Sequence, residues 1–200
     1  GLKVLNLGNP IDSRAELARG YSLMAIVLGS VPLHGLAQSW SDRGLALADL
    51  VKDPLVRVSV VIRRGVYGLG TAQWDVIVPE IREALATSEA LRDGRHTDEC
   101  RVTYAKTQLF QGNMEEAAEQ VITMYMAAKE RGDIQVEGWG MLNVTENRVR
   151  QGRVDEVKDI FPELESWLET TAVGSEKLIP VGHMALAAYY EGNHEDAARH

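Results

Sequence analysis

Five glycines recur at a nearly constant interval, and this interval limits what the chain can fold into. They are Gly29, Gly70, Gly112, Gly152 and Gly192, and neighbouring members are 40 to 42 residues apart. Around the last three, each glycine lies between polar residues, and a large side chain, two acids and a small apolar residue follow. A period of 20–50 residues is typical of repeat architectures, in which each repeat is one supersecondary unit. We therefore treat residues 1–200 as a single domain of repeats about 41 residues long.

The residues around these glycines predict two helices in each repeat. Glycine adopts the left-handed conformation that ends a helix, and acids such as Glu115 and Glu116 are favoured in the first turn of the next helix. Apolar residues recur at spacings of three and four, so we expect one helix over Thr97–Phe110 and a second over Met114–Arg131. We call the first helix of a repeat helix A and the second helix B.

Prolines place the boundaries between repeats, because proline is tolerated in the first turn of a helix and not in its interior. Asp53-Pro54 marks the boundary between two repeats, and Asn9-Pro10 marks an earlier boundary of the same kind. Residues Leu2–Leu7 then take the place of an earlier helix B, so we expect a piece cut from a longer array. The predicted repeats span about 10–53, 54–95, 96–133 and 134–174, with a partial repeat at 175–200.

Two local features test this interpretation. The β-branched run Val56–Ile62 favours a strand by propensity, but the repeat places it in a helix A. Pro162 lies within the fourth helix B and should kink or split it near Phe161. The sequence therefore predicts an all-α, right-handed α-solenoid of antiparallel helix hairpins.

The hairpins resemble tetratricopeptide repeats, with a small residue five positions after the turn glycine, as in Gly112 with Ala117 and Gly192 with Ala197. The family has a small residue at one position of helix A. In this chain that position is occupied by Ser22, Ala105, Thr145 and Ala185, but also by Arg63, which departs from the pattern. The long period, and phrases such as Ala-Leu-Ala-Asp-Leu-Val-Lys-Asp-Pro, look like the repeat regions of large bacterial signalling proteins, including MalT-like transcription regulators and NTPase- or cyclase-linked proteins. The resemblance implies a binding or regulatory segment.

Composition removes several function classes. The net charge is −8 and no run of Lys and Arg occurs, which is unfavourable for contact with nucleic acid. Cys100 is the only cysteine, so no intrachain disulfide forms, and no segment has the length of a membrane span. We expect a cytoplasmic protein.

The sequence contains no motif typical of a catalytic, metal or cofactor site, so we expect no enzyme activity, no metal and no cofactor. His96 and Cys100 share a helix face, but a second cluster that would complete a tetrahedral zinc site is missing. The sequence shows neither a phosphate-binding loop nor a nucleophile paired with a base. The four tryptophans are interpreted mainly as packing residues.

Two function hypotheses stay open: a scaffold that binds a protein or peptide, and a sensory segment that binds a small effector inside the superhelix and controls an attached catalytic or DNA-binding domain. Partners would include other domains of the same parent chain, and self-association through an end is a further expectation.

Charge differs between the two sets of helices. Most acidic charge falls in helices B, while helix A of the second repeat is basic. In tetratricopeptide-like arrays helix A lines the concave face, so the resemblance places a set of helix A residues on or near a groove that suits an acidic or carboxylate-ended peptide, with Tyr67 or Trp139 as an apolar anchor. The set is Arg57, Arg64, Tyr67, Lys106, Trp139, Asn143, Glu146 and His183.

Overall fold

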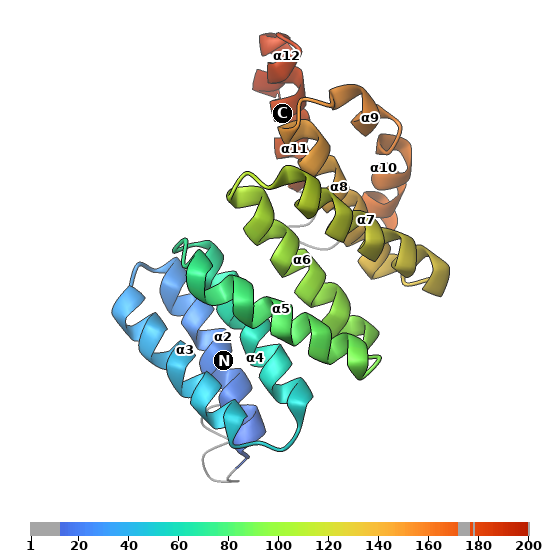
Figure 1. Ribbon diagram of the computed structural model, residues 1–200. Coiled ribbons are helices and arrows are strands. Elements are labelled where there is room, and N and C mark those ends of the chain that lie inside the picture. Colours follow the sequence, from blue (N-terminus) through green and yellow to red (C-terminus); the bar gives the residue numbers. More distant parts are fainter. Residues whose placement is uncertain (1–12, 172–176, 178, 200) are drawn as a thin grey trace. The chain divides into compact units, whose positions relative to one another are not determined.

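The computed structural model describes residues 13–171, 177 and 179–199 (Figure 1). This part of the chain is helical and contains no strand, so the all-α prediction is confirmed. The helices are α2 (Arg14–Ser30), α3 (His34–Asp49), α4 (Pro54–Leu69), α5 (Trp74–Ala90), α6 (Gly94–Phe110), α7 (Met114–Arg131), α8 (Ile134–Arg150), α9 (Val154–Lys158), α10 (Phe161–Thr170), α11 (Ile179–Tyr190) and α12 (His194–Arg199). Leu2–Leu7, the expected earlier helix B, lies outside the described residues.

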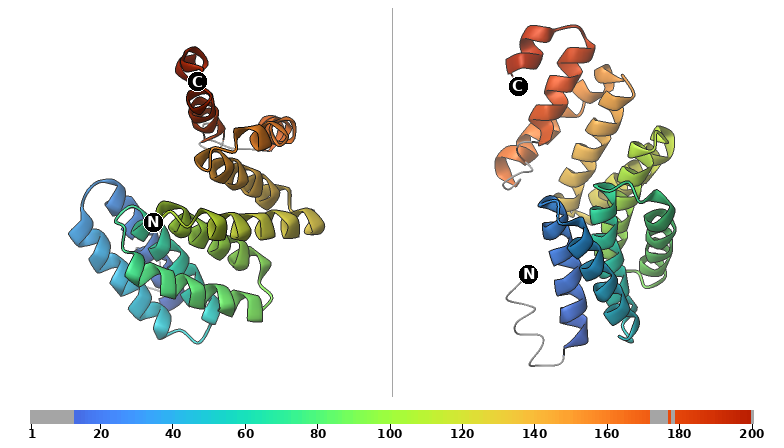
Figure 2. Two further views of the ribbon diagram at one scale, coloured as in Figure 1. Left: turned by 45° about the horizontal axis from the view of Figure 1, so that its top comes forward. Right: turned by 90° about the vertical axis from the view of Figure 1, so that its left-hand side faces the viewer.

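The chain forms two compact units, residues 1–107 and 108–200, and the boundary falls within α6. We describe each unit by itself. In unit 1, α2 packs against α3 and α4, and α4 packs against α5 (Figure 2). One buried cluster joins α2, α3 and α4 through Ala18, Ala48, Val56 and Val60.

A second cluster of unit 1 joins α4, α5 and α6. Val58, Ile62, Ile81, Cys100 and Tyr104 form its buried centre. The run Val56–Ile62 is helical, as the repeat period predicts. Nearly all of its side chains are buried because different neighbouring helices cover different sides of α4.

Unit 2 is centred on α8, which contacts α7, α9, α10 and α11. Trp167 of α10 is buried with Met141, Leu142 and Leu164, and its Nε1 donates to the backbone oxygen of Ile134 over 2.9 Å. The expected break at Pro162 is confirmed, since α9 ends at Lys158 and α10 begins at Phe161.

Three of the five periodic glycines close helices as predicted. Gly112, Gly152 and Gly192 have φ values of 85°, 73° and 77°, in the left-handed region that favours glycine.

The left-handed expectation is wrong for Gly29 and Gly70. Gly29 lies inside α2, and a Cβ there would stand 2.6 Å from Cδ2 of Tyr67, so this glycine makes room for an aromatic ring. Gly70 has a right-handed φ of −73°, and Ala72 takes the left-handed conformation in that turn, with φ 54°. The same residue type therefore serves close packing in one repeat and turn geometry in another.

Helix starts are explained by side-chain caps at two repeat boundaries. Asp53 accepts from the backbone nitrogen of Leu55 over 2.9 Å, and Asp133 accepts from that of Val136 over 3.1 Å. Each carboxylate satisfies an orphan amide and favours the positive end of the helix dipole. Pro54 begins α4, as the boundary prediction requires.

Gly138 is the position at which unit 2 depends most directly on a missing side chain. A Cβ at Gly138 would lie 1.8 Å from Cε2 of Trp167. We expect Gly138→Ala to lower the free energy of unfolding by about 1–3 kcal/mol, because the buried ring has to move. Urea unfolding followed by circular dichroism measures this change.

The matched control is Gly35→Ala in α3, where an added Cβ meets no atom within 4 Å. Here the free energy of unfolding should stay equal or rise by up to about 1 kcal/mol, through the better helix propensity of alanine. Equal effects of the two substitutions would refute the proposed packing of Trp167 on Gly138.

Candidate functional site

The structure divides the eight predicted groove residues between the two units. Arg57, Arg64, Tyr67 and Lys106 lie in unit 1, on α4 and α6, and Trp139, Asn143, Glu146 and His183 lie in unit 2, on α8 and α11. Within each unit their surroundings show which side chains face an open surface and which serve packing.

Arg64 faces the neighbouring helices B. Its guanidinium contacts Asp42 of α3 and Glu80 of α5, each over 2.8 Å, and donates to Oγ of Ser41 over 2.9 Å. Burial opposes the charge, but hydrogen bonds and charges from Asp42 and Glu80 outweigh it and raise the pKa of Arg64. The structure thus gives Arg64 contacts that join three helices.

Arg57 repeats this arrangement two helical turns earlier. It contacts Asp49 of α3 over 3.1 Å and Glu83 of α5 over 3.2 Å. Arg57 and Arg64 are seven residues apart and so occupy the same side of α4. Two of the basic side chains of this helix A are thus paired with acids of the adjacent helices B.

Arg63 occupies a different side of α4. Its Nη1 donates to the backbone oxygen of Ser59 over 2.7 Å, which is its one hydrogen bond within the described part of the chain. The charged groups that act on it are Glu99 of α6 and Arg19 and Glu16 of α2, all on helices A. Arg63 therefore points to the side of α4 that no helix B covers.

The acids near Arg63 have closer cationic partners. Glu16 contacts Arg19 over 2.6 Å, and Glu99 contacts Arg95 over 2.7 Å. Burial lowers the pKa of Arg63, Glu99 opposes this effect and Arg19 adds to it. Arginine still remains charged at neutral pH, so Arg63 holds a positive charge on a half-buried side chain with one hydrogen bond.

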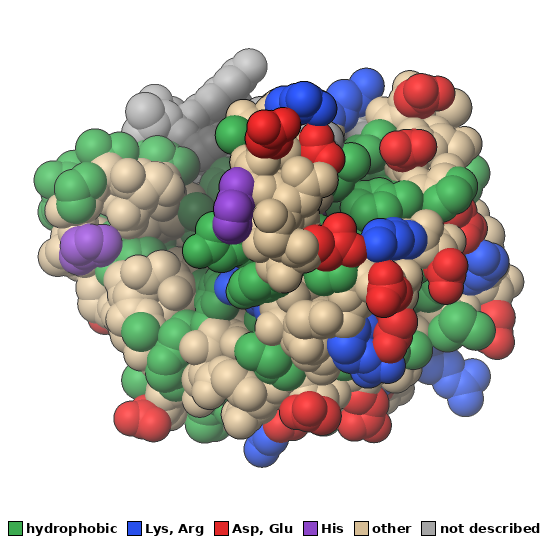
Figure 3. All heavy atoms as spheres, turned by 90° about the horizontal axis from the view of Figure 1, so that it is seen from above, with side chains coloured by type: hydrophobic (Ala, Val, Ile, Leu, Met, Phe, Trp, Pro, Cys, Tyr) green, Lys and Arg blue, Asp and Glu red, His purple; other side chains and the backbone are tan. Residues whose placement is uncertain are grey.

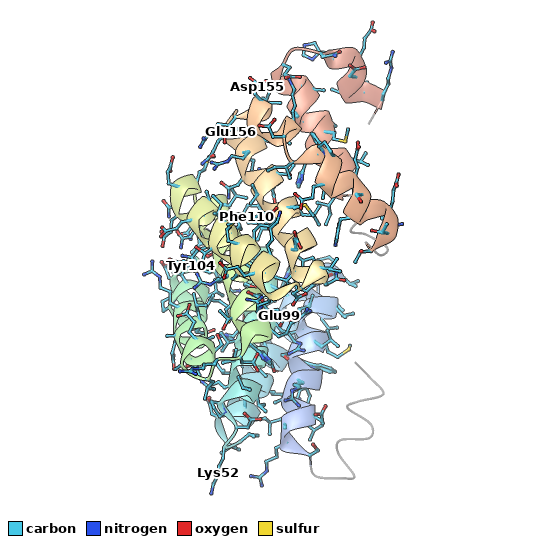
Figure 4. All side chains as sticks on the ribbon, turned by 90° about the vertical axis from the view of Figure 1, so that its right-hand side faces the viewer. Lys52, Glu99, Tyr104, Phe110, Asp155 and Glu156 are labelled. Atoms are coloured by element: carbon cyan, nitrogen blue, oxygen red, sulfur yellow. The ribbon has the colours of Figure 1, made fainter. Side chains whose placement is uncertain are left out.

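Side chains at helical spacing from Arg63 extend this surface over three helices. We define the open face of unit 1 by six exposed or half-buried residues at spacings of three or four along their helices. They are Arg19 and Leu23 of α2, Arg63 and Val66 of α4, and Glu99 and Val102 of α6. Glu99 and Tyr104 project from different sides of α6, and Tyr104 reaches Arg82 of α5 (Figure 4).

Tyr67 and Lys106 border the open face. Tyr67 is buried against Gly29, and its hydroxyl donates to the backbone oxygen of His34 over 3.4 Å. Lys106 is half-buried on α6, seven residues after Glu99. The resemblance placed Arg57 and Arg64 on the binding surface but not Arg63. The sequence feature that could have pointed to Arg63 is that an arginine occupies a position where the family has a small residue.

In unit 2, Trp139, Asn143 and Glu146 follow one another along α8. Trp139 is half-buried and packs against the Trp167 cluster, and Asn143 donates to the backbone oxygen of Trp139 over 2.7 Å. Glu146 is buried and accepts from Nε of Arg150 over 3.2 Å. His183 is half-buried on α11. Asn143 and Glu146 thus have hydrogen-bond partners within α8.

The acids of α9 are also matched by bases. Lys158 contacts Asp155 over 3.2 Å and Glu191 over 2.7 Å, and Arg148 contacts Glu156 over 3.1 Å. Figure 3 shows acidic and basic side chains beside one another on one face of the chain. This surface of unit 2 is mixed in charge.

Cys100 is completely buried in unit 1. Burial raises the pKa of its thiol to about 12, and neighbouring Glu99 and Glu89 add to this effect while a hydrogen bond with Ser88 opposes it. Over residues 13–171 and 179–199, no group of three His, Cys, Asp or Glu side chains is placed to hold a metal ion. A search of the described helices finds none with the length and apolar character needed to cross a membrane.

Comparison with known proteins adds no family: no protein-family model matches the chain, and no curated protein matches it significantly.

The role given to Arg64 predicts a loss of stability. Arg64→Ala should lower the free energy of unfolding by about 1–2 kcal/mol, because it leaves the partly buried Glu80 without its partner. Arg43→Ala, at an exposed position of α3, is the control and should change it by less than about 0.5 kcal/mol. Chemical unfolding of both variants measures the difference. Equal stabilities would contradict the role of Arg64 in joining α3, α4 and α5.

The environment of Cys100 predicts a slow thiol. In the folded protein, modification by an aromatic disulfide reagent at pH 8 should be at least about a hundredfold slower than in urea, because the thiolate is rare and the sulfur is covered. Spectrophotometry of the released chromophore gives both rates. Similar rates would show that this core opens readily.

Proposed function

We propose that this chain is a non-catalytic interaction segment that binds a protein or peptide over the open face of unit 1. In this proposal the helix pairs belong to a right-handed solenoid with a period of about 41 residues. The segment resembles tetratricopeptide repeats and regulates, or is regulated by, other domains of a multidomain signalling protein. The proposal rests on a single observation, the half-buried guanidinium of Arg63 with its one hydrogen bond to Ser59.

Arg63 has more hydrogen-bond donors than its one hydrogen bond uses. A guanidinium has five N–H donors in a planar fork, and one hydrogen bond to Ser59 uses a fraction of that capacity. Burial has already removed part of its hydration. A carboxylate that approaches from the open side would therefore gain charge-assisted hydrogen bonds at a small further desolvation cost.

The side chains around Arg63 suit a polypeptide. Leu23 and Val66, both about two-fifths exposed, offer apolar contact on α2 and α4. Lys106 adds a second cation, and Glu99 with Arg95 gives polar contacts at the margin of the surface. An acidic peptide that lies across α2, α4 and α6 would meet both kinds of group.

The hollows of the described residues support a peptide more than an enclosed effector. Three of them have volumes of about 250, 200 and 400 Å³, and each is open to solvent. A small effector is usually enclosed over most of its surface. We therefore prefer the scaffold hypothesis to the sensory one.

A peptide panel tests the proposed function. Fluorescein-labelled decapeptides of acidic, neutral and basic composition would be titrated with the full chain, and fluorescence anisotropy would give the dissociation constants. We expect the acidic peptides to bind most tightly. Arg63→Gln should weaken them about tenfold, which corresponds to the loss of a charge-assisted hydrogen bond.

Arg43→Gln is the matched control, because it removes the same charge from an exposed site on α3. Its dissociation constants should equal those of the unmodified chain. Equal weakening by the two substitutions would mean that net charge alone governs binding, and unchanged affinity with Arg63→Gln would rule out the open face as the site.

A further inference from the structure

A hollow lies between the C-terminal ends of α2 and α4, beside the open face. Its volume is about 250 Å³, and its lining includes Ile26 and Gly29 of α2 and Val66 and Tyr67 of α4. His34, Thr71, Ser30 and Gly70 complete it. All of these residues belong to unit 1.

The surface of the hollow is mainly carbon. Ile26, Val66 and the ring of Tyr67 supply apolar walls, and none of the lining residues is Asp, Glu, Lys or Arg. The hydroxyls of Ser30 and Thr71 donate to backbone oxygens of their own chain segments, Ser30 to Ile26 over 3.0 Å and Thr71 to Gly68 over 3.4 Å. The hollow therefore favours an apolar group.

Gly29 lets the ring of Tyr67, which forms one wall of the hollow, lie close to the backbone of α2. A Cβ at this position would stand 2.6 Å and 2.7 Å from two atoms of the Tyr67 ring, so the ring lies over the backbone of α2. The Tyr67 hydroxyl meets the backbone oxygen of His34, which fixes the ring edge. The wall formed by Tyr67 is thus set by packing and is present before any ligand binds.

Arg63 lies on the same side of α4 as Val66, three residues earlier. Its guanidinium turns back toward the N-terminus of the helix, to the backbone oxygen of Ser59. Val66, the residue of α4 at which the lining of the hollow begins, is seven residues after Ser59, and this corresponds to roughly 10 Å at 1.5 Å per residue. A cationic group and an apolar hollow therefore lie in line along α4.

We propose that this pair of features recognises an extended peptide segment in which an apolar side chain and an acidic side chain are three residues apart. The apolar side chain enters the hollow and the carboxylate meets Arg63. In the extended polyproline II conformation, residues three positions apart lie on the same side of the peptide and about 9 Å apart, close to the separation along α4. The inference rests on the proposed function and specifies the ligand of the same surface.

A free chain terminus fits this spacing poorly. The C-terminal carboxylate of a peptide is attached to the same Cα as its last side chain, so the two groups cannot span roughly 10 Å. An acidic side chain three positions away from the apolar residue can. The charge complementarity comes from Arg63, and the size and carbon surface of the hollow suit a leucine or phenylalanine side chain.

A symmetric probe tests the inference without assuming a direction for the peptide. Acetyl-Glu-Ser-Gly-Leu-Gly-Ser-Glu-amide carries a leucine three residues from an acid on either side, and its blocked ends remove terminal charges. Two companion peptides replace the leucine by glycine, or both acids by glutamine. Titrations of the full chain, followed by NMR chemical shifts up to millimolar concentration, would give the dissociation constants.

We expect the leucine probe to bind about tenfold more tightly than the glycine companion, through burial of its apolar side chain. Val66→Phe fills the hollow and should abolish this advantage of the leucine probe over the glycine companion. Val76→Phe on α5 is the matched control, because Val66 and Val76 are 41% and 42% exposed, and it should bind like the unmodified chain.

Each outcome separates the two proposals. Equal affinities of the leucine and glycine probes, no saturable binding of the leucine probe, or an unaltered leucine advantage in Val66→Phe would overturn the inference. If Arg63→Gln still weakens the acidic decapeptides in those cases, the proposed function stands. If Arg63→Gln changes the affinity of no acidic peptide, the proposed function fails and the inference fails with it.

Discussion

Arg64 joins α3, α4 and α5 through ion pairs with Asp42 of α3 and Glu80 of α5, and Arg57 makes the same kind of contacts seven residues earlier. We call these contacts of the two arginines the clamp. The clamp determines which side of α4 stays open. Two arginines on one side of the helix fix that side toward helices B. Arg63, one position earlier and about 100° around the helix, is then directed toward the surface formed by helices A.

The rest of the packing depends on small residues as much as on large ones. Gly29, Gly65 and Gly68 let α4 lie close to α2, α6 and α5, since an added Cβ would stand within 3 Å of a side chain of each neighbour. Within the described residues, the buried apolar side chains form several clusters. Stability is therefore distributed along the chain, and a local substitution such as Gly138→Ala should act mainly on its own cluster.

Much of this fold could be predicted from the sequence, because turn glycines, caps and helical periodicity are local signals. Pro54, Pro162 and the bounds of α7 follow directly from such signals. The left-handed role of Gly29 could not be corrected from the sequence, since its true constraint is the ring of Tyr67, 38 residues later. The periodic spacing alone could not distinguish a turn glycine from a packing glycine.

The candidate site was less predictable for a related reason. Composition showed that helix A of the second repeat is basic and that helices B are acidic, but the sequence did not show that these charges meet one another. Arg57 and Arg64 were expected to serve a ligand, and they contact Asp49, Glu83, Asp42 and Glu80. Arg63 differs from its neighbour only in the direction of its side chain, which the fold determines.

The most direct test of the account is to locate bound peptide on α4. Backbone amide shifts of the full chain would be recorded while the leucine probe is added, and residues on the two sides of this helix would be compared. The account predicts that the largest shifts occur at Ser59, Arg63 and Val66, with little change at Arg57, Val61 and Arg64. Shifts concentrated at Arg57, Val61 and Arg64 would contradict it, because the peptide would then occupy the side that the clamp closes.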